Sequence, residues 1–253
     1  MSGHSKWAKI KHAKGAADAK KGKVFSRLAK ELMVIAKQGG GDPTMNAALR
    51  NAIQKAKAVN MPNDNIDRAI KKGTGEMGGA IYEEVSYEGY AGGGVGLLVK
   101  VLTDNKNRAA AEIRHIFTRH GSNFATLGAV SRGFTRKGQI LVDAASVDEE
   151  KLMDIVLNAG AEDMQPDGEH FEILTDPANF LQVVEALEKA ELKPVSSEIR
   201  MVPDTYVQVT DKVVAKAVMK FVETLEDNED VQDVYTNLDV PDAVMAEIEK
   251  EGG

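Results

Sequence analysis

The spacing of apolar residues changes abruptly at a glycine-rich stretch, residues 74–80, and this change constrains the fold more than any other feature of the chain. Before it, apolar residues recur every third or fourth position, which is the period of an amphipathic helix. After it, apolar and polar residues alternate over short runs, which is typical of half-buried strands. We therefore expect a helical domain, a linker, and then mixed α+β structure.

Three helices are expected before the linker. The first covers residues 24–38, and the glycines at 39–41 end it. Asp42, followed by Pro43, predicts the N-cap of the second helix, which runs to about residue 59. The third opens at residue 63 and closes before Gly73. The first helix carries a basic face opposite its apolar one, formed by Lys23, Arg27, Lys30 and Lys37.

The alternating part begins with a predicted hairpin, residues 84–90 and 95–103. A helix over 105–120 and a strand around 129–135 are expected to follow. Residues 138–203 then show the strand–helix–strand–strand–helix–strand order of a ferredoxin-like unit.

A last helix, residues 211–225, and a last strand, residues 231–236, have no sheet of their own, so they are expected to complete the first sheet. The predicted fold class is α+β multidomain: an N-terminal three-helix domain followed by two α+β domains, the second a ferredoxin-like βαββαβ unit inserted in the first. The predicted domains are residues 1–80 (basic arm and three-helix domain), 81–137 plus 204–240 (α+β domain), 138–203 (inserted domain) and 241–253 (acidic tail).

Charge is divided unevenly along the chain. Residues 1–72 hold sixteen lysines and arginines against five acids, whereas the remaining 181 residues have a net charge of −18. A second basic zone, residues 100–137, has a net charge of +6, and residues 138–253 have −20. This asymmetry is typical of a polyanion-binding end attached to an acidic body.

Several chemistries are excluded or disfavoured. The chain has no cysteine, no GK[ST] phosphate loop and no G-x-S-x-G elbow, and the acid run 226–230 resembles a solvated helix end. His115 and His120 do not share a helix face, so no metal site is predicted. We expect a non-enzyme without a metal, a cofactor or a small-molecule substrate. The apolar runs are too short for a membrane span and the N-terminus is not a secretory signal, so a cytoplasmic location is expected.

The basic residues predict a nucleic-acid interface, because lysine and arginine bind phosphate by releasing counterions. Trp7, which lies among the arm lysines, either stacks on a base or packs against the helical domain. The candidate nucleic-acid-binding residues are Lys6, Trp7, Lys9, Lys11, Lys14, Lys20, Lys21, Lys23, Arg27, Lys30, Arg108 and Arg119.

Five sequence blocks resemble the YebC/PmpR family, which includes the mitochondrial translational activator of cytochrome c oxidase. They are residues 3–7, 39–43, 60–73 without 63, 87–90 and 102–108. The resemblance implies three domains, one helical and two α+β. The sequence differs from the family pattern after Tyr90, where Ala91 and Gly92 replace the usual Gly-Pro.

The predicted function is a non-enzymatic nucleic-acid-binding regulator of gene expression. The resemblance implies a DNA-binding transcriptional regulator. The alternative, also implied by the resemblance, is a ribosome-associated translation factor that contacts ribosomal RNA and assists synthesis of proline-rich stretches. Phosphate backbones are common to both targets, so charge does not separate them.

Overall fold

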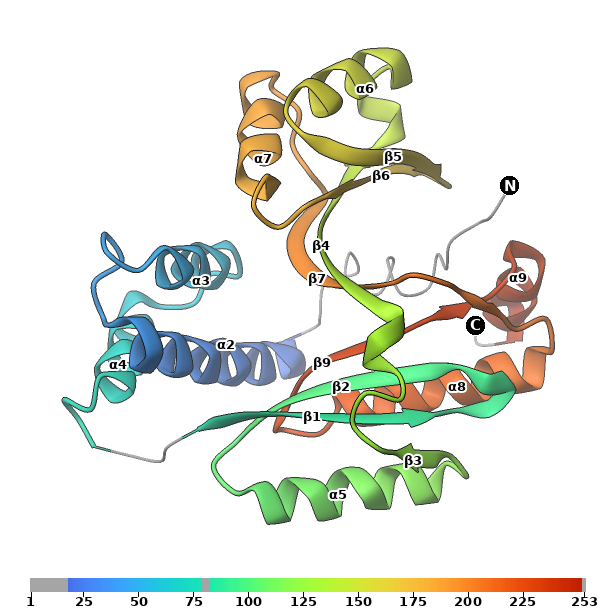
Figure 1. The fold of residues 1–253 in the computed structure, drawn as a ribbon, viewed down its shortest axis with the longest axis horizontal. Helices are drawn as coiled ribbons and strands as arrows, with labels where there is room; N and C mark the ends of the chain where they lie inside the picture. Colours follow the sequence, from blue (N-terminus) through green and yellow to red (C-terminus); the bar gives the residue numbers. More distant parts are fainter. Residues whose placement is uncertain (1–17, 79–81, 252–253) are drawn as a thin grey trace.

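The computed structural model describes residues 18–78 and 82–251, which form a helical domain, a four-stranded sheet with its helices, and an inserted ferredoxin-like unit (Figure 1). Each of these parts has an apolar cluster of its own. The α+β multidomain fold class is confirmed. None of the helices formed by the described residues combines the length and apolar character that crossing a bilayer requires.

The helical domain consists of α2 (Asp18–Gly39), α3 (Ala47–Ala58) and α4 (Asn63–Gly73). Their inward faces bury an apolar cluster that includes Leu32 and Leu49, both fully buried. Helix α2 starts within the segment expected to be an arm. The prediction that Asp42 caps α3 is wrong. Its carboxylate accepts hydrogen bonds from Thr44, which closes a turn, and Asn46 caps the helix instead by accepting from the Leu49 N–H.

The first sheet has the strand order β3–β1–β2–β9, and all its pairs are antiparallel. Helices α5 and α8 pack on one face of this sheet, and Phe117 of α5 meets Phe221 of α8 edge-to-face within the cluster. The return of β9 to pair with β2 shows that the segment after the insert completes the first sheet, as predicted. The elements are β1 (Glu83–Tyr90), β2 (Gly96–Thr103), α5 (Lys106–Arg119), β3 (Asn123–Ala125), α8 (Lys212–Glu226) and β9 (Val231–Thr236), with the 3-10 turn η1 (Gly92–Gly94).

Of the strand predicted around residues 129–135, only Phe134 and Thr135 are in a strand, at the start of β4 (Phe134–Asp143). A buried carboxylate explains why the residues before them are not. Glu88, 1% exposed, accepts the backbone N–H groups of Gly128, Val130 and Ser131 at 2.9, 2.6 and 3.0 Å. These N–H groups are therefore occupied and cannot join a strand ladder. Residues 129–133 form a loop that contains the 3-10 turn η2 (Ser131–Gly133).

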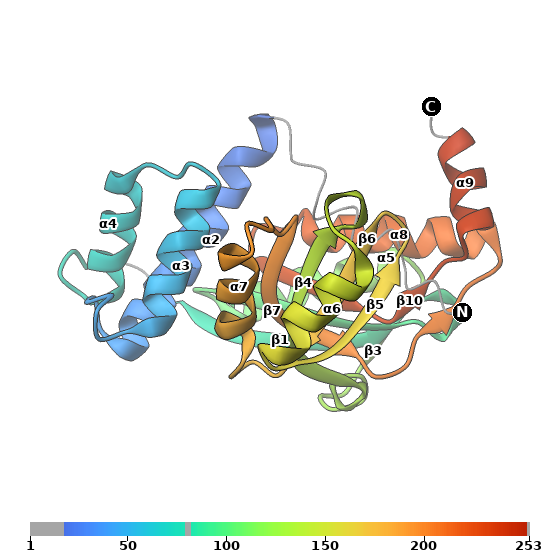
Figure 2. The ribbon, with the colours of Figure 1, turned by 90° about the horizontal axis from the view of Figure 1, so that it is seen from above.

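The inserted unit has the strand order β5–β6–β4–β7, with every pair antiparallel, and α6 and α7 cover one face (Figure 2). The ferredoxin-like order is therefore confirmed. Its elements are β4 (Phe134–Asp143), η3 (Ala144–Ser146), α6 (Glu149–Asn158), β5 (Ala161–Asp167), β6 (His170–Thr175), α7 (Phe180–Lys189) and β7 (Ser196–Pro203).

Apolar side chains fix the insert to the first sheet. Phe134 and Met201, at the base of β4 and β7, pack with Leu98 of β2, Tyr235 of β9 and Val130. A parallel pair, β8 (Val207–Gln208) with β10 (Leu238–Asp239), lies beyond the insert. Residues 242–251 of the predicted acidic tail form α9 (Asp242–Glu251), whose Met245 is buried against the α5 and α8 cluster.

The pairing of β4 with β7 predicts that the insert can be removed. Thr135 and Val202 are cross-strand partners, so their Cα atoms lie roughly 5 Å apart and a short linker can join them. Replacing residues 136–201 with a glycine–serine linker should leave a remainder that unfolds cooperatively. Hydrogen exchange should show protected amides in α8 and β9, as in the full chain. Loss of protection in α8 would mean that this helix depends on the insert.

Candidate nucleic-acid interface

The predicted interface residues fall into four groups in the structure. Lys6, Trp7, Lys9, Lys11 and Lys14 lie outside the described residues. Lys20 and Lys21 lie in the first turns of α2. Lys23, Arg27 and Lys30, here called the α2 basic face, contact the first α+β domain, and Arg108 of that domain pairs with Asp230 of the same domain. Arg119 is exposed at the end of α5.

The α2 basic face meets residues 226–230, here called the acidic turn, which join α8 to β9. Lys23 Nζ donates to the carbonyl oxygen of Asp227 at 2.9 Å and to its Oδ1 at 3.1 Å. The Arg27 guanidinium donates to the carbonyl oxygen of Glu226. These carbonyls end α8, where the helix dipole is negative and backbone oxygens lack helical partners, so cations are stabilised there.

Asp230 joins the helical domain, α5 and β2 at one carboxylate. Its Oδ1 accepts from Lys30 Nζ at 2.8 Å, and its Oδ2 accepts from an Arg108 guanidinium nitrogen at 2.7 Å and from the Thr103 hydroxyl at 2.9 Å. The side chains of Lys30 and Asp230 are only 13% and 6% exposed. A nearly buried carboxylate is thus paired by two cations from different elements.

These partners determine the protonation of Asp230. Burial opposes ionisation, but the hydrogen bonds from Lys30, Arg108 and Thr103 outweigh it and lower the pKa of the carboxyl below its ordinary value. Asp230 is therefore ionised at neutral pH. The same contacts occupy both cations.

The α2 basic face does not point only to solvent. Lys23, Arg27 and Lys30 donate to an acidic turn that is about 200 residues away in the sequence. The acid run expected to be a solvated helix end is the partner of this face. Arg108 and Arg119 lie at opposite ends of α5, and of the two only Arg108 contacts Asp230.

A cleft of about 910 Å³ lies along this contact, between α2 on one side and α5 with the acidic turn on the other. Lys23, Arg27, Lys30 and Arg108 all line it, together with Tyr82. The Lys30 ammonium lies 5.4 Å from the centre of the Tyr82 ring, which suits a cation–π contact. The cleft thus gathers four of the predicted phosphate-binding side chains, with carboxylates among them.

Exposed basic side chains that sequence reasoning did not select lie on α4. Arg68, Lys71 and Lys72 are exposed, and Arg68 and Lys72 border a groove of about 210 Å³ between α2 and α4. Their i, i+4 spacing opposite the buried Ile66 and Ala69 is the sequence signal that could have identified them. The described part of the helical domain therefore presents cations on a second side.

Arg119, the other predicted residue of α5, is exposed at the C-terminal end of the helix. It adjoins His120, whose pKa is lowered mainly by burial and secondarily by the positive charges of Arg119 and Lys220. His120 stacks on Phe221 with ring centres 5.0 Å apart. This end of α5 is therefore a small basic site with a neutral imidazole at neutral pH.

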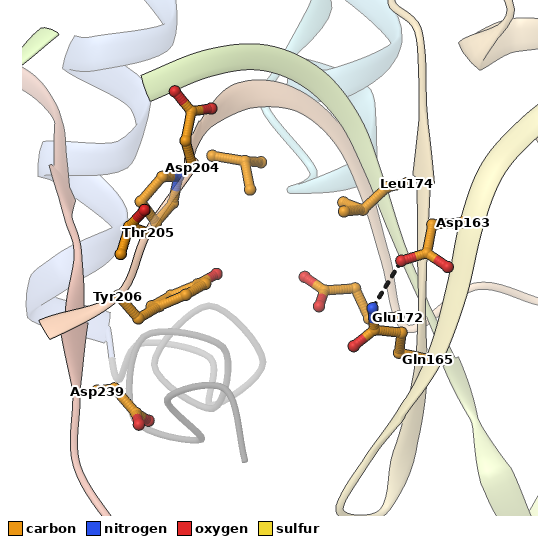
Figure 3. A pocket seen from close by; sticks show the side chains of 10 residues that line it. Asp163, Gln165, Glu172, Leu174, Asp204, Thr205, Tyr206 and Asp239 are labelled. Atoms are coloured by element: carbon orange, nitrogen blue, oxygen red, sulfur yellow. Dashed lines mark hydrogen bonds between the residues drawn. The ribbon is translucent and has the colours of Figure 1, made fainter. Parts of the chain in front are cut away.

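Carboxylates line the cavity of about 410 Å³ between the insert and the segment that follows it (Figure 3). Asp163, Glu172, Asp204 and Asp239 border it, and the Tyr206 side chain points into it. Burial and the surrounding carboxylates raise the pKa of Tyr206. Such a lining repels phosphate, so this cavity is not part of the candidate interface. In the part of the chain that the structure describes, no group of three acids or histidines is arranged to hold a metal ion.

The Asp230 contacts predict a large loss of stability on substitution. Asp230→Ala should lower the free energy of unfolding by about 3 kcal/mol, because it leaves the nearly buried Lys30 without its carboxylate. Asp227→Ala should cost under about 1 kcal/mol, since the Asp227 side chain is 73% exposed. Urea titrations of both variants at neutral pH measure these differences. Equal losses would contradict the central role of Asp230.

The same substitution should change the response to acid. The folded-state pKa of Asp230 is depressed, so its stabilisation is present above the pKa of the unfolded state and is lost as the pH falls through the folded value. The difference in stability between the protein and Asp230→Ala should therefore shrink below pH ~4.

Comparison with known proteins places the whole architecture in one family. Residues 5–76 match the TACO1/YebC protein N-terminal domain, and residues 82–238 match the TACO1/YebC second and third domain. A Treponema pallidum protein named "probable transcriptional regulatory protein" is 55% identical over 97% of this chain and 100% of its own length. A protein of the same name from Halothermothrix orenii is 52% identical over 99% and 100%.

A solved structure has the same fold. The crystal structure of a conserved hypothetical protein from Aquifex aeolicus superposes with a TM-score of 0.80 at 46% sequence identity, covering 89% of this chain and 93% of that one. The similarity extends through the helical domain and both α+β domains, in agreement with the two matched segments. This chain belongs to the TACO1/YebC family.

Proposed function

We propose that this protein is a non-enzymatic regulator of gene expression that binds DNA and controls transcription. The observation that carries the proposal is the separation of charge, with +11 on residues 1–72 and −18 on the remainder. A basic domain attached to an acidic body suits a phosphate backbone as partner. Its relatives named "probable transcriptional regulatory protein" support transcription as the process.

Two groups of cations are proposed to make the contact. The first is the arm, with Lys6, Lys9, Lys11 and Lys14 and without a single acid in residues 1–17. The second is the exposed set Arg68, Lys71 and Lys72 on α4, on the same basic domain. Lysine contacts phosphate as a point charge, whereas arginine reads guanine with two hydrogen bonds. Because lysine dominates both groups, we expect most of the affinity to come from the backbone of the nucleic acid.

The acidic α+β body is proposed to face away from the DNA. The cavity lined by Asp163, Glu172, Asp204 and Asp239 repels polyanions and so limits binding to the basic side of the molecule. The described residues add no observation that favours the ribosome-associated alternative. It is therefore the competing outcome of the experiment. A cytoplasmic location follows from the proposed function.

Salt dependence tests the first group of contacts. Replacing Lys6, Lys9, Lys11 and Lys14 with Gln should flatten the slope of log affinity against log salt for duplex DNA by roughly 3–4, because each lost phosphate contact contributes about 0.9. The measurement is fluorescence anisotropy with a labelled duplex over a salt series. The control replaces four exposed lysines of the acidic part, Lys151, Lys189, Lys193 and Lys250, and should leave the slope unchanged.

Sequence specificity for DNA tests whether the protein regulates transcription. A transcriptional regulator should bind a promoter fragment at least ~10³-fold more tightly than random duplex of the same length. Genomic DNA recovered after crosslinking in cells supplies the candidate fragments. Equal affinity for all duplexes, together with ribonuclease-sensitive sedimentation with ribosomes, would contradict the transcriptional function and favour the translation factor.

A further inference from the structure

We propose that the acidic turn is an autoinhibitory competitor that occupies the α2 basic face, and that a nucleic-acid phosphate backbone takes its place when the helical domain swings away. The proposal rests on the nucleic-acid binding proposed above and adds the regulation of that site. It concerns the cleft of about 910 Å³ between α2 and α5, where Lys23, Arg27, Lys30 and Arg108 converge.

The acidic turn presents the chemistry of a phosphate run. Its sequence places four carboxylates at 226, 227, 229 and 230, and it follows directly on the negative end of α8. The α2 basic face contacts both kinds of oxygen, with Lys23 on the carbonyl and carboxylate of Asp227 and Lys30 on the carbonyl of Glu229 and the carboxylate of Asp230. These carboxylate and carbonyl oxygens accept the hydrogen bonds that phosphate oxygens would accept from the same lysines.

The helical domain is held to the rest of the described structure by charge rather than by apolar packing. Its apolar cluster contains only residues between Val24 and Ile70. Among the described residues, none of the apolar clusters joins this domain to the two α+β domains. The insert differs, because Phe134 and Met201 pack on the first sheet. Contacts between charges weaken as salt is added or as a polyanion competes, whereas apolar packing does not.

The geometry also allows movement. The helical domain joins the first sheet through one connection, residues 74–82, which contains Gly75, Gly78 and Gly79. Gly75 and Gly78 adopt positive φ values of 85° and 63°, which glycine takes without strain. The side chains of the ion pair Lys23–Asp227 are also substantially exposed, so water and counterions reach this contact. Opening therefore requires no rearrangement of an apolar core.

If the acidic turn competes with DNA for the α2 basic face, substitutions should have an effect that a purely structural contact would not produce. Substitutions on either side of the Lys23–Asp227 pair should open the molecule, but they should change DNA affinity in opposite directions. Asp227→Lys removes the competitor and leaves the α2 basic face intact, so it should tighten binding. Lys23→Glu removes a cation from that face, so it should weaken binding. Both side chains are exposed enough for the variants to fold.

Opening is measured without nucleic acid by fluorescence energy transfer. The chain has no cysteine, so Asn51→Cys on α3 and His115→Cys on α5, both exposed, give two unique dye positions. Asp227→Lys and Lys23→Glu should each lower the transfer efficiency. The charge swap Lys23→Glu with Asp227→Lys should restore it, because the pair reforms with reversed sign.

Affinity is measured on the same variants with a mixed-sequence duplex DNA. Asp227→Lys should bind roughly three- to tenfold more tightly than the unsubstituted protein, since apparent affinity rises with the fraction of open molecules. Lys23→Glu should bind more weakly by a similar factor. Glu223→Lys is the matched control, because it makes the same charge change one turn earlier in α8, where Glu223 contacts Lys220. It should leave transfer efficiency unchanged and should tighten binding less.

The outcomes separate this proposal from the proposed function. If Asp227→Lys leaves transfer efficiency unchanged, or opens the molecule yet binds no better than Glu223→Lys, the acidic turn is not a competitor and DNA binding stands alone. If neither the unsubstituted protein nor the open Asp227→Lys variant binds the duplex, both proposals fail. Opposite changes in affinity with the same opening would support autoinhibition.

Discussion

The carboxylate of Asp230 is the contact on which the arrangement of the domains depends. It lies where α8 has ended and β9 begins, and it is paired at once with Lys30 of α2 and Arg108 of α5. Because it is nearly buried, removing either its charge or its partners leaves an unpaired ion in a poorly solvated place. The position of the helical domain is thus tied to one acidic residue of a different domain.

Two kinds of interface coexist in this molecule. The insert meets the first sheet through Phe134, Met201, Leu98 and Tyr235, which are apolar or aromatic side chains. The helical domain meets it through ammonium, guanidinium, carboxylate and carbonyl groups. We expect the first interface to persist in salt and the second to respond to it. This difference gives the basic domain freedom to exchange an internal acidic partner for an external one.

The sequence predicted the elements better than the contacts between them. Periodicity located the helices of the first domain and the ferredoxin-like order, because helices and strands each give apolar residues a characteristic local spacing. It failed at residues 129–133, where the distant Glu88 accepts backbone N–H groups. Charge counting predicted a basic domain but not its acidic partner, since Lys23 and Asp227 are 204 positions apart. An ion pair between residues so far apart in the sequence leaves no recognisable pattern of neighbouring residues.

The radius of gyration in solution, measured by small-angle scattering as salt is raised, tests the central claim that charge alone holds the helical domain in place. Between roughly 0.05 M and 1 M salt the screening length falls from more than about 10 Å to about 3 Å. The radius of gyration should increase over this range while the far-ultraviolet circular dichroism stays constant, because the domains separate without unfolding. An unchanged radius of gyration across the whole range would contradict the claim.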